Sequence, residues 1–190
     1  MNNLFIAENL KVITKVLPIL KIQIHQKEIS LIVKRDHLIP VLTFLKNHIK
    51  YQFKILTCIS GVDYPSQKYR FKVVYELLSV KYNTRIRVKV LTDELTPIES
   101  CCKIFPAAGW YESETWDMYG IFFANHVNLT RLLTDYGFEG YPLRKDFPLS
   151  GFVESSYDYT RKRVTNERVE LSQEYRAFKF TSPWETLELN

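Results

Sequence analysis

The chain has 190 residues, of which 46% are hydrophobic and 25% charged, a globular composition that excludes a wholly disordered or collagen-like chain. Its net charge of +5 is unevenly placed: residues 1–95 hold 16 Lys and Arg against 7 Asp and Glu, and residues 96–190 hold 10 against 14. A basic front half and an acidic back half indicate two surfaces with different partners, or solvated faces without any.

The first 35 residues predict a helix followed by a strand pair. Apolar residues of 3–17 recur at helical spacing, and Pro18 discourages continuation of that helix. Alternating apolar residues then predict strands at 21–25 and 28–33, with the loop at 26–27.

An amphipathic helix is expected next, with Asp36 as its N-cap and Pro40 in its first turn. One face of it carries Leu38, Val41, Leu42, Leu45 and Ile49. The nearly apolar run 38–45 is too short to cross a membrane, which takes roughly 20 residues.

Three further strands are predicted at 53–60, 69–80 and 85–91. The last alternates cleanly, with Ile86, Val88 and Val90 facing inward and Arg85, Arg87 and Lys89 facing outward. A sheet of this kind buries one face under helices and leaves the other polar.

Thr96-Pro97-Ile98-Glu99 has the form of a capping box and predicts the start of a helix that Pro106 interrupts. A second helical piece over about 107–119 would end at Gly120. We therefore expect an α+β domain over 1–119, with a mostly antiparallel sheet of about five strands and helices on one face.

Residues 120–190 are predicted to form an extended C-terminal arm. Their short apolar stretches are separated by Gly, Pro and charged residues, and would bury little against one another. They are nevertheless rich in Tyr, Phe and Leu, which is untypical of a disordered tail. An arm covered by another subunit explains this composition, and a second small domain is the alternative.

The carboxylates Glu112, Glu114 and Asp117 lie among aromatic residues and could serve acid–base chemistry or a hard cation. No nucleophile or third ligand accompanies them, so a charged face that pairs with Arg or Lys is favoured. His126 is interpreted as a packing or capping residue. Arg144-Lys145-Asp146 resembles an interface hot spot.

Three cysteines, Cys58, Cys101 and Cys102, make an odd number with no CxxC spacing. This pattern disfavours a disulfide framework and favours a reducing compartment. It also argues against a zinc or iron–sulfur site held by this chain alone, because such sites take about four ligands, mostly thiolates. No secretory or mitochondrial leader is expected from the first 15 residues.

Three stretches carry a resemblance to a known family. Residues 112–120 read ESETWDMYG, residues 131–140 read RLLTDYGFEG, and residues 142–151 read PLRKDFPLSG. They resemble the ERExWDMxG element and following segments of the thirty-kilodalton subunit of respiratory NADH:quinone oxidoreductase (complex I), which is called subunit nine in mitochondria and has a bacterial equivalent. GVDYP at 61–65, RFKVVY at 70–75, VELSQEYR at 169–176 and SPW at 182–184 extend the resemblance to roughly 28–184.

Several positions depart from that family's pattern. Ser113 and Thr130 stand where the family has arginines, and Val127-Asn128 stands where it has Pro-Asp. Tyr141 replaces a histidine. The ion pairs that those arginines make in relatives are therefore absent here or supplied by a partner.

The resemblance implies a non-catalytic structural subunit of the peripheral arm, needed for assembly and for electron transfer from NADH to ubiquinone by the whole complex. The chain would hold no cofactor or metal, whereas the complex uses FMN, iron–sulfur clusters, NADH and ubiquinone. Its partners would be the quinone-pocket subunit and the iron–sulfur subunits, on the matrix side of the mitochondrial inner membrane or the cytoplasmic face of a bacterial membrane, with no nucleic acid bound. The expected interface residues are Glu112, Glu114, Trp116, Asp117, His126, Arg131, Asp135, Tyr136, Phe138, Arg144, Lys145, Asp146 and Phe147.

Two other classes of function remain open from the residues themselves. One is an RNA-binding module that uses the basic strand face, although that face lacks the outward aromatic residues that stack on bases. The other is a stand-alone enzyme that uses Glu114 and Asp117.

Overall fold

The computed structural model describes residues 12–26, 28–176 and 178. The chain divides into two compact units, Met1–Phe147 and Pro148–Asn190, called here the sheet unit and the hairpin unit. This division lies beyond the boundary expected at residue 119. The difference arises because residues 121–147 are bonded to the sheet unit, as described below.

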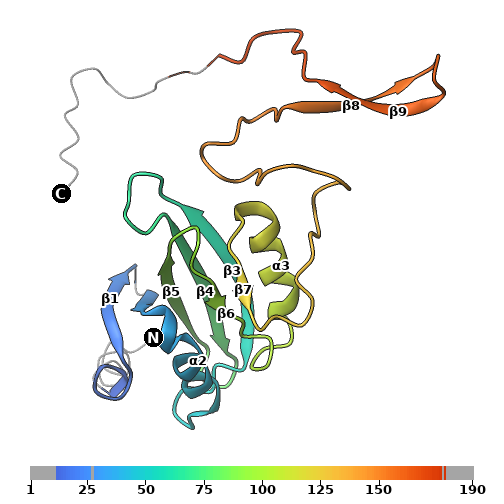
Figure 1. Ribbon diagram of the computed structural model, residues 1–190. Helices are drawn as coiled ribbons and strands as arrows, with labels where there is room; N and C mark the ends of the chain where they lie inside the picture. Colours follow the sequence, from blue (N-terminus) through green and yellow to red (C-terminus); the bar gives the residue numbers. More distant parts are fainter. Residues whose placement is uncertain (1–11, 27, 177, 179–190) are drawn as a thin grey trace, which may run out of the picture. The chain divides into compact units, whose positions relative to one another are not determined.

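The sheet unit is built on a five-stranded sheet with the order β1-β2-β5-β4-β3 (Figure 1). Its strands are β1 (Ile19–His25), β2 (Glu28–Val33), β3 (Ile55–Asp63), β4 (Phe71–Ser79) and β5 (Thr84–Thr92). All neighbours pair antiparallel except β2 and β5, which run parallel. The expected α+β class with a mostly antiparallel sheet is therefore confirmed.

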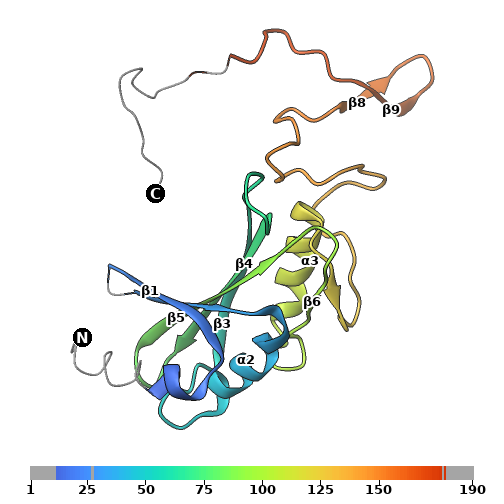
Figure 2. The same ribbon diagram turned by 60° about the vertical axis from the view of Figure 1, so that its left-hand side comes forward.

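One face of the sheet is buried and the other is polar. On β5, Ile86, Val88 and Val90 are buried, whereas Arg87 and Lys89 lie on the partly exposed face, as the alternation predicts. Helix α2 (Leu38–Asn47) lies beside the sheet (Figure 2), and its buried apolar residues belong to the same hydrophobic cluster as those strand residues. On the open face, Arg87 is paired with Glu28 and Glu76.

The predicted cap of α2 is wrong. A single 3-10 turn, η1 (Arg35–His37), precedes the helix, and His37 occupies the N-cap without a side-chain hydrogen bond. Asp36 instead pairs with the neighbouring Arg35 at the surface. Burial of Leu38 and the residues that follow it sets the start of this helix more strongly than local capping does.

The predicted capping box at 96–99 is also wrong. Ile98–Glu99 forms a short strand, β6, that pairs in parallel with β7 (Phe123–Ala124). Pairing across the chain buries Ile98 completely and overrides the local helical signal. The second predicted helical piece is correct: α3 (Ala108–Tyr119) ends at Gly120, which has a φ of 76°.

The N-terminal helix expected over 3–17 lies partly outside the described residues. Residues 12–16 are helical, and Leu17 donates a backbone hydrogen bond to Ile13. Across the described ranges, no helix combines the length and the apolar character needed to span a bilayer.

The hairpin unit contains two antiparallel strands, β8 (Val153–Asp158) and β9 (Arg163–Arg168). Asp158 closes the connection by accepting hydrogen bonds from the amides of Thr160 and Arg161. No described residue from 148 to 178 is buried. An isolated two-stranded hairpin is at best marginally stable in water, so this unit has no core of its own to stabilise it.

The backbone of β3 approaches α3 closely at Gly61. A Cβ atom at this position would lie 2.6 Å from the ring of Tyr119. We expect Gly61→Ala to lower the free energy of unfolding by about 2 kcal/mol, since overpacking moves the ring or the strand. Urea unfolding followed by circular dichroism measures this change.

Gly109→Ala is the matched control, because a Cβ there meets Cys102 only at an ordinary contact distance of 3.7 Å. Its position in α3 favours alanine, with an effect between zero and about 1 kcal/mol of stabilisation. Equal destabilisation by the two variants would contradict the close approach at Gly61.

Candidate functional site

Helix α3 and the segment 121–147 contain most of the residues that the sequence marks as functional. Glu112 and Asp117 are both completely buried, although each is ionisable. A buried carboxylate is costly unless hydrogen bonds or charges compensate it. The partners of these two carboxylates therefore reveal how the region is built.

Asp117 anchors the segment that begins at Arg131. Its Oδ2 accepts the amides of Leu132, Leu133 and Thr134 at 3.1, 2.8 and 2.9 Å, and its Oδ1 accepts the Thr134 hydroxyl at 2.7 Å. Arg131 lies 3.3 Å from Oδ1 and also donates to the carbonyl of Gly140. Burial alone would raise the pKa of Asp117, but these hydrogen bonds outweigh it and the pKa is lowered.

A second anchor lies at the end of β3, where Arg70 donates to both oxygens of Asp63 at 2.8 and 3.0 Å. Arg70 also pairs with Glu94 and with Asp146, and the amide of Lys145 donates to Asp63. The hydrogen bond from Arg70 is the main reason that the pKa of Asp63 is lowered. This network ties residues 145–146 to the sheet.

Arg144 joins the C-terminal end of α3 to the same network. Its Nε donates to the carbonyl of Tyr119 at 2.7 Å, and its guanidinium lies over the rings of Phe71 and Tyr141. A glycine is required at position 120 for two reasons. Its φ is positive, and a Cβ atom there would lie 2.7 Å from the Arg144 guanidinium.

Glu112 has a different set of partners. It accepts the Ser100 hydroxyl at 2.6 Å and the Cys101 amide at 2.8 Å, and the Cys102 thiol lies 3.3 Å from its Oε2. His126 Nε2 is 3.7 Å from the same oxygen. Burial is the largest cause of the raised pKa of Cys102, so this thiol is a poor nucleophile at neutral pH.

The structure sorts the thirteen expected interface residues by accessibility. Glu112 and Asp117 are buried, and their oxygens are bonded within the chain. The half-buried residues are Glu114, Trp116, His126, Arg131, Phe138, Arg144 and Phe147, of which Phe138 and Phe147 have ring centroids 5.9 Å apart. Asp135, Tyr136, Lys145 and Asp146 are exposed, and Tyr136 is exposed completely.

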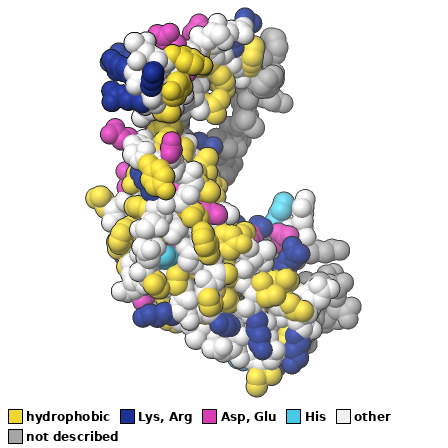
Figure 3. All heavy atoms as spheres, turned by 90° about the vertical axis from the view of Figure 1, so that its right-hand side faces the viewer, with side chains coloured by type: hydrophobic (Ala, Val, Ile, Leu, Met, Phe, Trp, Pro, Cys, Tyr) yellow, Lys and Arg dark blue, Asp and Glu magenta, His cyan; other side chains and the backbone are white. Residues whose placement is uncertain are grey.

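Further exposed apolar side chains include Leu95, Trp110 and Val127 in the sheet unit, and Leu149, Phe152, Tyr157, Tyr159 and Val164 in the hairpin unit. Figure 3 shows hydrophobic side chains scattered over the face that carries α3. Contiguous apolar patches, and not side chains exposed singly, mark a surface that a partner covers.

Asp63, Arg70 and Glu94 are charged partners that sequence reasoning missed. The available signal was the GVDYP stretch at 61–65, where an aspartate follows a buried strand. Its partner Arg70 follows seven residues later and stands just before β4.

Four of the five departures from the family pattern lie at one place. Ser113, Val127, Asn128 and Thr130 all line a cavity of about 440 Å³ beside α3. Two of them, Ser113 and Thr130, have shorter side chains than the arginines expected there. Cys102 and His126 also line this cavity.

Residues 31–153 match the family described as "Respiratory-chain NADH dehydrogenase, 30 Kd subunit". The chain is 55% identical to NADH-ubiquinone oxidoreductase subunit 9 of Reclinomonas americana, over 86% of this chain and 80% of the relative. It is 57% identical to the corresponding NADH-quinone oxidoreductase subunit of Rhizobium etli (strain CIAT 652), over 87% and 83%.

A protein of Oryza sativa subsp. japonica named NADH dehydrogenase [ubiquinone] iron-sulfur protein 3 is 59% identical over 79% of each chain. Among solved structures, a chain of the membrane-bound sulfane sulfur reductase, an archaeal respiratory membrane complex, matches with a TM-score of 0.65 and 26% identity. That match covers 75% of this chain and 85% of the other.

Asp117→Asn tests the anchor at α3. The amide group replaces one acceptor oxygen with a donor that faces backbone N–H groups, so we expect a loss of about 3 kcal/mol in the free energy of unfolding at neutral pH. The difference from the wild type should shrink as pH falls below the ordinary aspartate value of 3.8, because a lowered pKa stabilises the fold only while the carboxylate is ionised. Urea unfolding at neutral and acid pH measures both effects.

Asp135→Asn is the control, because that carboxylate is exposed and accepts only the amide of the next residue. It should change the free energy of unfolding by less than about 0.5 kcal/mol. If the two variants lose equal stability, or if the loss in Asp117→Asn is independent of pH, the anchor is misassigned.

Proposed function

The chain belongs to the family of thirty-kilodalton subunits of respiratory-chain NADH dehydrogenase, and from this membership we propose that it is a core, non-catalytic structural subunit of the peripheral arm of proton-pumping NADH:ubiquinone oxidoreductase. In this role it is needed for assembly of the complex and for electron transfer from NADH to ubiquinone by the whole complex. The match in sequence over residues 31–153 is the observation that carries this proposal.

The partners we propose are the quinone-pocket subunit and the iron–sulfur subunits of that arm. The hairpin unit supports this choice, since its apolar side chains are exposed and no described residue of it is buried. Those side chains lose contact with water only when another protein covers them. The hairpin unit would therefore be the part that becomes stable on assembly.

We place the chemistry of the complex in other subunits, which would carry the FMN and the iron–sulfur clusters. The carboxylates of Glu112 and Asp117 support this, because both are engaged in hydrogen bonds within the chain. Glu112 also lies between Cys102 and His126, so the thiol donates to the carboxylate and not to the imidazole. A position on the matrix side of the mitochondrial inner membrane, or on the cytoplasmic side in a bacterium, accompanies this role.

The double variant Tyr157→Ser, Val164→Ser tests the hairpin unit as the assembly contact. These residues are directly paired between β8 and β9, and both are exposed. In a host that lacks its own copy of the subunit, we expect several-fold less assembled complex on native electrophoresis. The complex that does assemble should keep the wild-type KM for NADH, because the site for NADH is on another chain.

Leu95→Ser is the matched control, since Leu95 is almost fully exposed but belongs to the sheet unit. It should assemble normally. A double variant that assembles like the wild type, or that changes the KM for NADH at normal assembly, would contradict the proposed role.

Trypsin provides a second test, because Arg161, Lys162 and Arg163 lie at the turn of the exposed hairpin. We expect rapid cleavage there in the isolated chain and protection in the assembled complex. Arg144, which is half-buried and bonded to Tyr119, serves as the internal reference and should be cut slowly in both states. Mass spectrometry of the fragments reports each site separately, and equal hairpin cleavage in both states would exclude coverage by a partner.

A further inference from the structure

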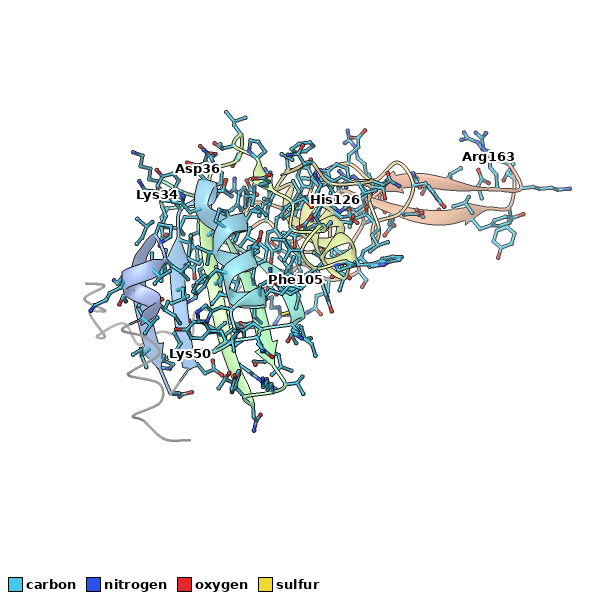
Figure 4. The ribbon with its side chains drawn as sticks, turned by 90° about the horizontal axis from the view of Figure 1, so that it is seen from below. Lys34, Asp36, Lys50, Phe105, His126 and Arg163 are labelled. Carbon is cyan, nitrogen blue, oxygen red and sulfur yellow. The ribbon has the colours of Figure 1, made fainter. Side chains whose placement is uncertain are left out.

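Three side chains of the types that bind transition metals converge beside α3. Cys102 comes from the loop after β6, Glu112 from α3, and His126 from the turn after β7, where Figure 4 shows it next to the helix. Glu112 Oε2 lies 3.3 Å from Cys102 Sγ and 3.7 Å from His126 Nε2. The three ligand atoms all lie within 4.8 Å of one another.

Glu112 is held as a preorganised ligand. Its carboxylate is completely buried and is fixed by the Ser100 hydroxyl and the Cys101 amide, which would remain as outer hydrogen bonds around an ion. Within the described ranges, no lysine or arginine forms an ion pair with Glu112. A divalent cation would supply the positive charge that a buried carboxylate otherwise lacks.

The cavity of about 440 Å³ gives access to this cluster. Cys102 and His126 form part of its lining, together with Gly109, Ser113, Asn128 and Thr130. The volume has room for an ion to enter and for a water molecule to complete a fourth position. Glu112 does not line the cavity, but its Oε2 is close to both lining ligands.

We propose that Cys102, Glu112 and His126 bind a zinc ion, with a water molecule from the cavity as the fourth ligand. Thiolate, imidazole and carboxylate ligands together favour zinc over magnesium or calcium, which take oxygen ligands. Zinc bonds of about 2.0–2.3 Å in a tetrahedron place ligand atoms about 3.3–3.7 Å apart. The two distances to Glu112 Oε2 already lie in that range.

Binding rearranges two protons. The zinc ion replaces the thiol proton of Cys102, which is released to solvent. His126 now donates from Nε2 to the Gly109 carbonyl and accepts the Asn128 amide at Nδ1. Zinc would coordinate Nε2 in place of its proton, and the ring would then be protonated at Nδ1. The Asn128 amide, which lies on an exposed loop, would then donate to water instead of to Nδ1. One thiolate and one carboxylate balance the two charges of the ion, and one proton leaves for each ion bound.

The sequence predicts no metal site, because the expected pattern is four ligands supplied mostly by cysteines. Cys102 and Glu112 are ten residues apart, and His126 follows fourteen residues later, beyond the end of α3. The pairing of β6 with β7 brings the segments of Cys102 and His126 together, and the hydrogen bonds that Glu112 accepts from Ser100 and Cys101 join α3 to them.

The test uses the untagged full-length chain, stripped with a chelator and titrated with zinc or cobalt ions. We expect one zinc per chain by elemental analysis and, with cobalt, the near-ultraviolet absorption of a thiolate-to-cobalt transition. Cys102→Ser and His126→Gln should each weaken zinc binding by at least about tenfold. Cys58→Ser is the matched control, because that partly buried cysteine lies on β3 and belongs to no ligand cluster among the described residues.

Four results would overturn the site. The wild-type chain could bind less than one zinc, or its cobalt form could lack the thiolate band, and neither result depends on the folding of a variant. Alternatively, folded Cys102→Ser could retain wild-type affinity, or Cys58→Ser could lose it equally, which would place the ion elsewhere. Circular dichroism checks that each variant has the wild-type fold.

Discussion

The second half of the sheet unit depends on the carboxylate of Asp117. Three backbone amides and one hydroxyl from residues 132–134 converge on it, and they turn an irregular segment into a fixed one. The leucine side chains at 132 and 133 stay exposed, so their burial does not hold the segment in place. A buried charge held by oriented donors therefore fixes the position of this segment. In the sheet, burial of apolar side chains such as Val88 and Tyr75, which are fully covered, has the same effect.

The same hydrogen bonds explain why the recognisable stretches of the sequence occur together. WDMYG contains the acceptor Asp117, RLLTDYG supplies its donors, and PLRKDF returns to Tyr119 through Arg144 and to Asp63 through Lys145. The main effect of these stretches is therefore to form hydrogen bonds within the chain. In the proposed role, Arg144 and Asp146 would position the surface that a partner meets, and the fully exposed Tyr136 would lie on that surface.

The sheet was predictable because alternation is a local property of each strand. The alternation of β5 is apparent from residues 85–91 alone, and the buried pattern follows it. The strand that contains Ile98 could not be predicted in this way. It forms because Ile98 pairs with Phe123, a residue far along the chain, whereas the local capping signal predicts a helix. For the same reason the bond between Asp63 and Lys145, and the meeting of Cys102 with His126, are consequences of tertiary structure that no spacing rule contains.

The two units differ in which of their groups are buried within the chain. The sheet unit compensates the buried carboxylates of Asp63 and Asp117 with its own arginines and backbone amides, so neither carboxylate needs a partner subunit. The hairpin unit instead exposes Tyr157, Tyr159 and Val164 without any buried residue among those described, so its apolar groups remain in water in the isolated chain. In the proposed role, the free energy of covering these side chains would be gained on association and not on folding. The order of the hairpin would then be coupled to the presence of the neighbouring subunits, because a partner that binds only the ordered hairpin stabilises it.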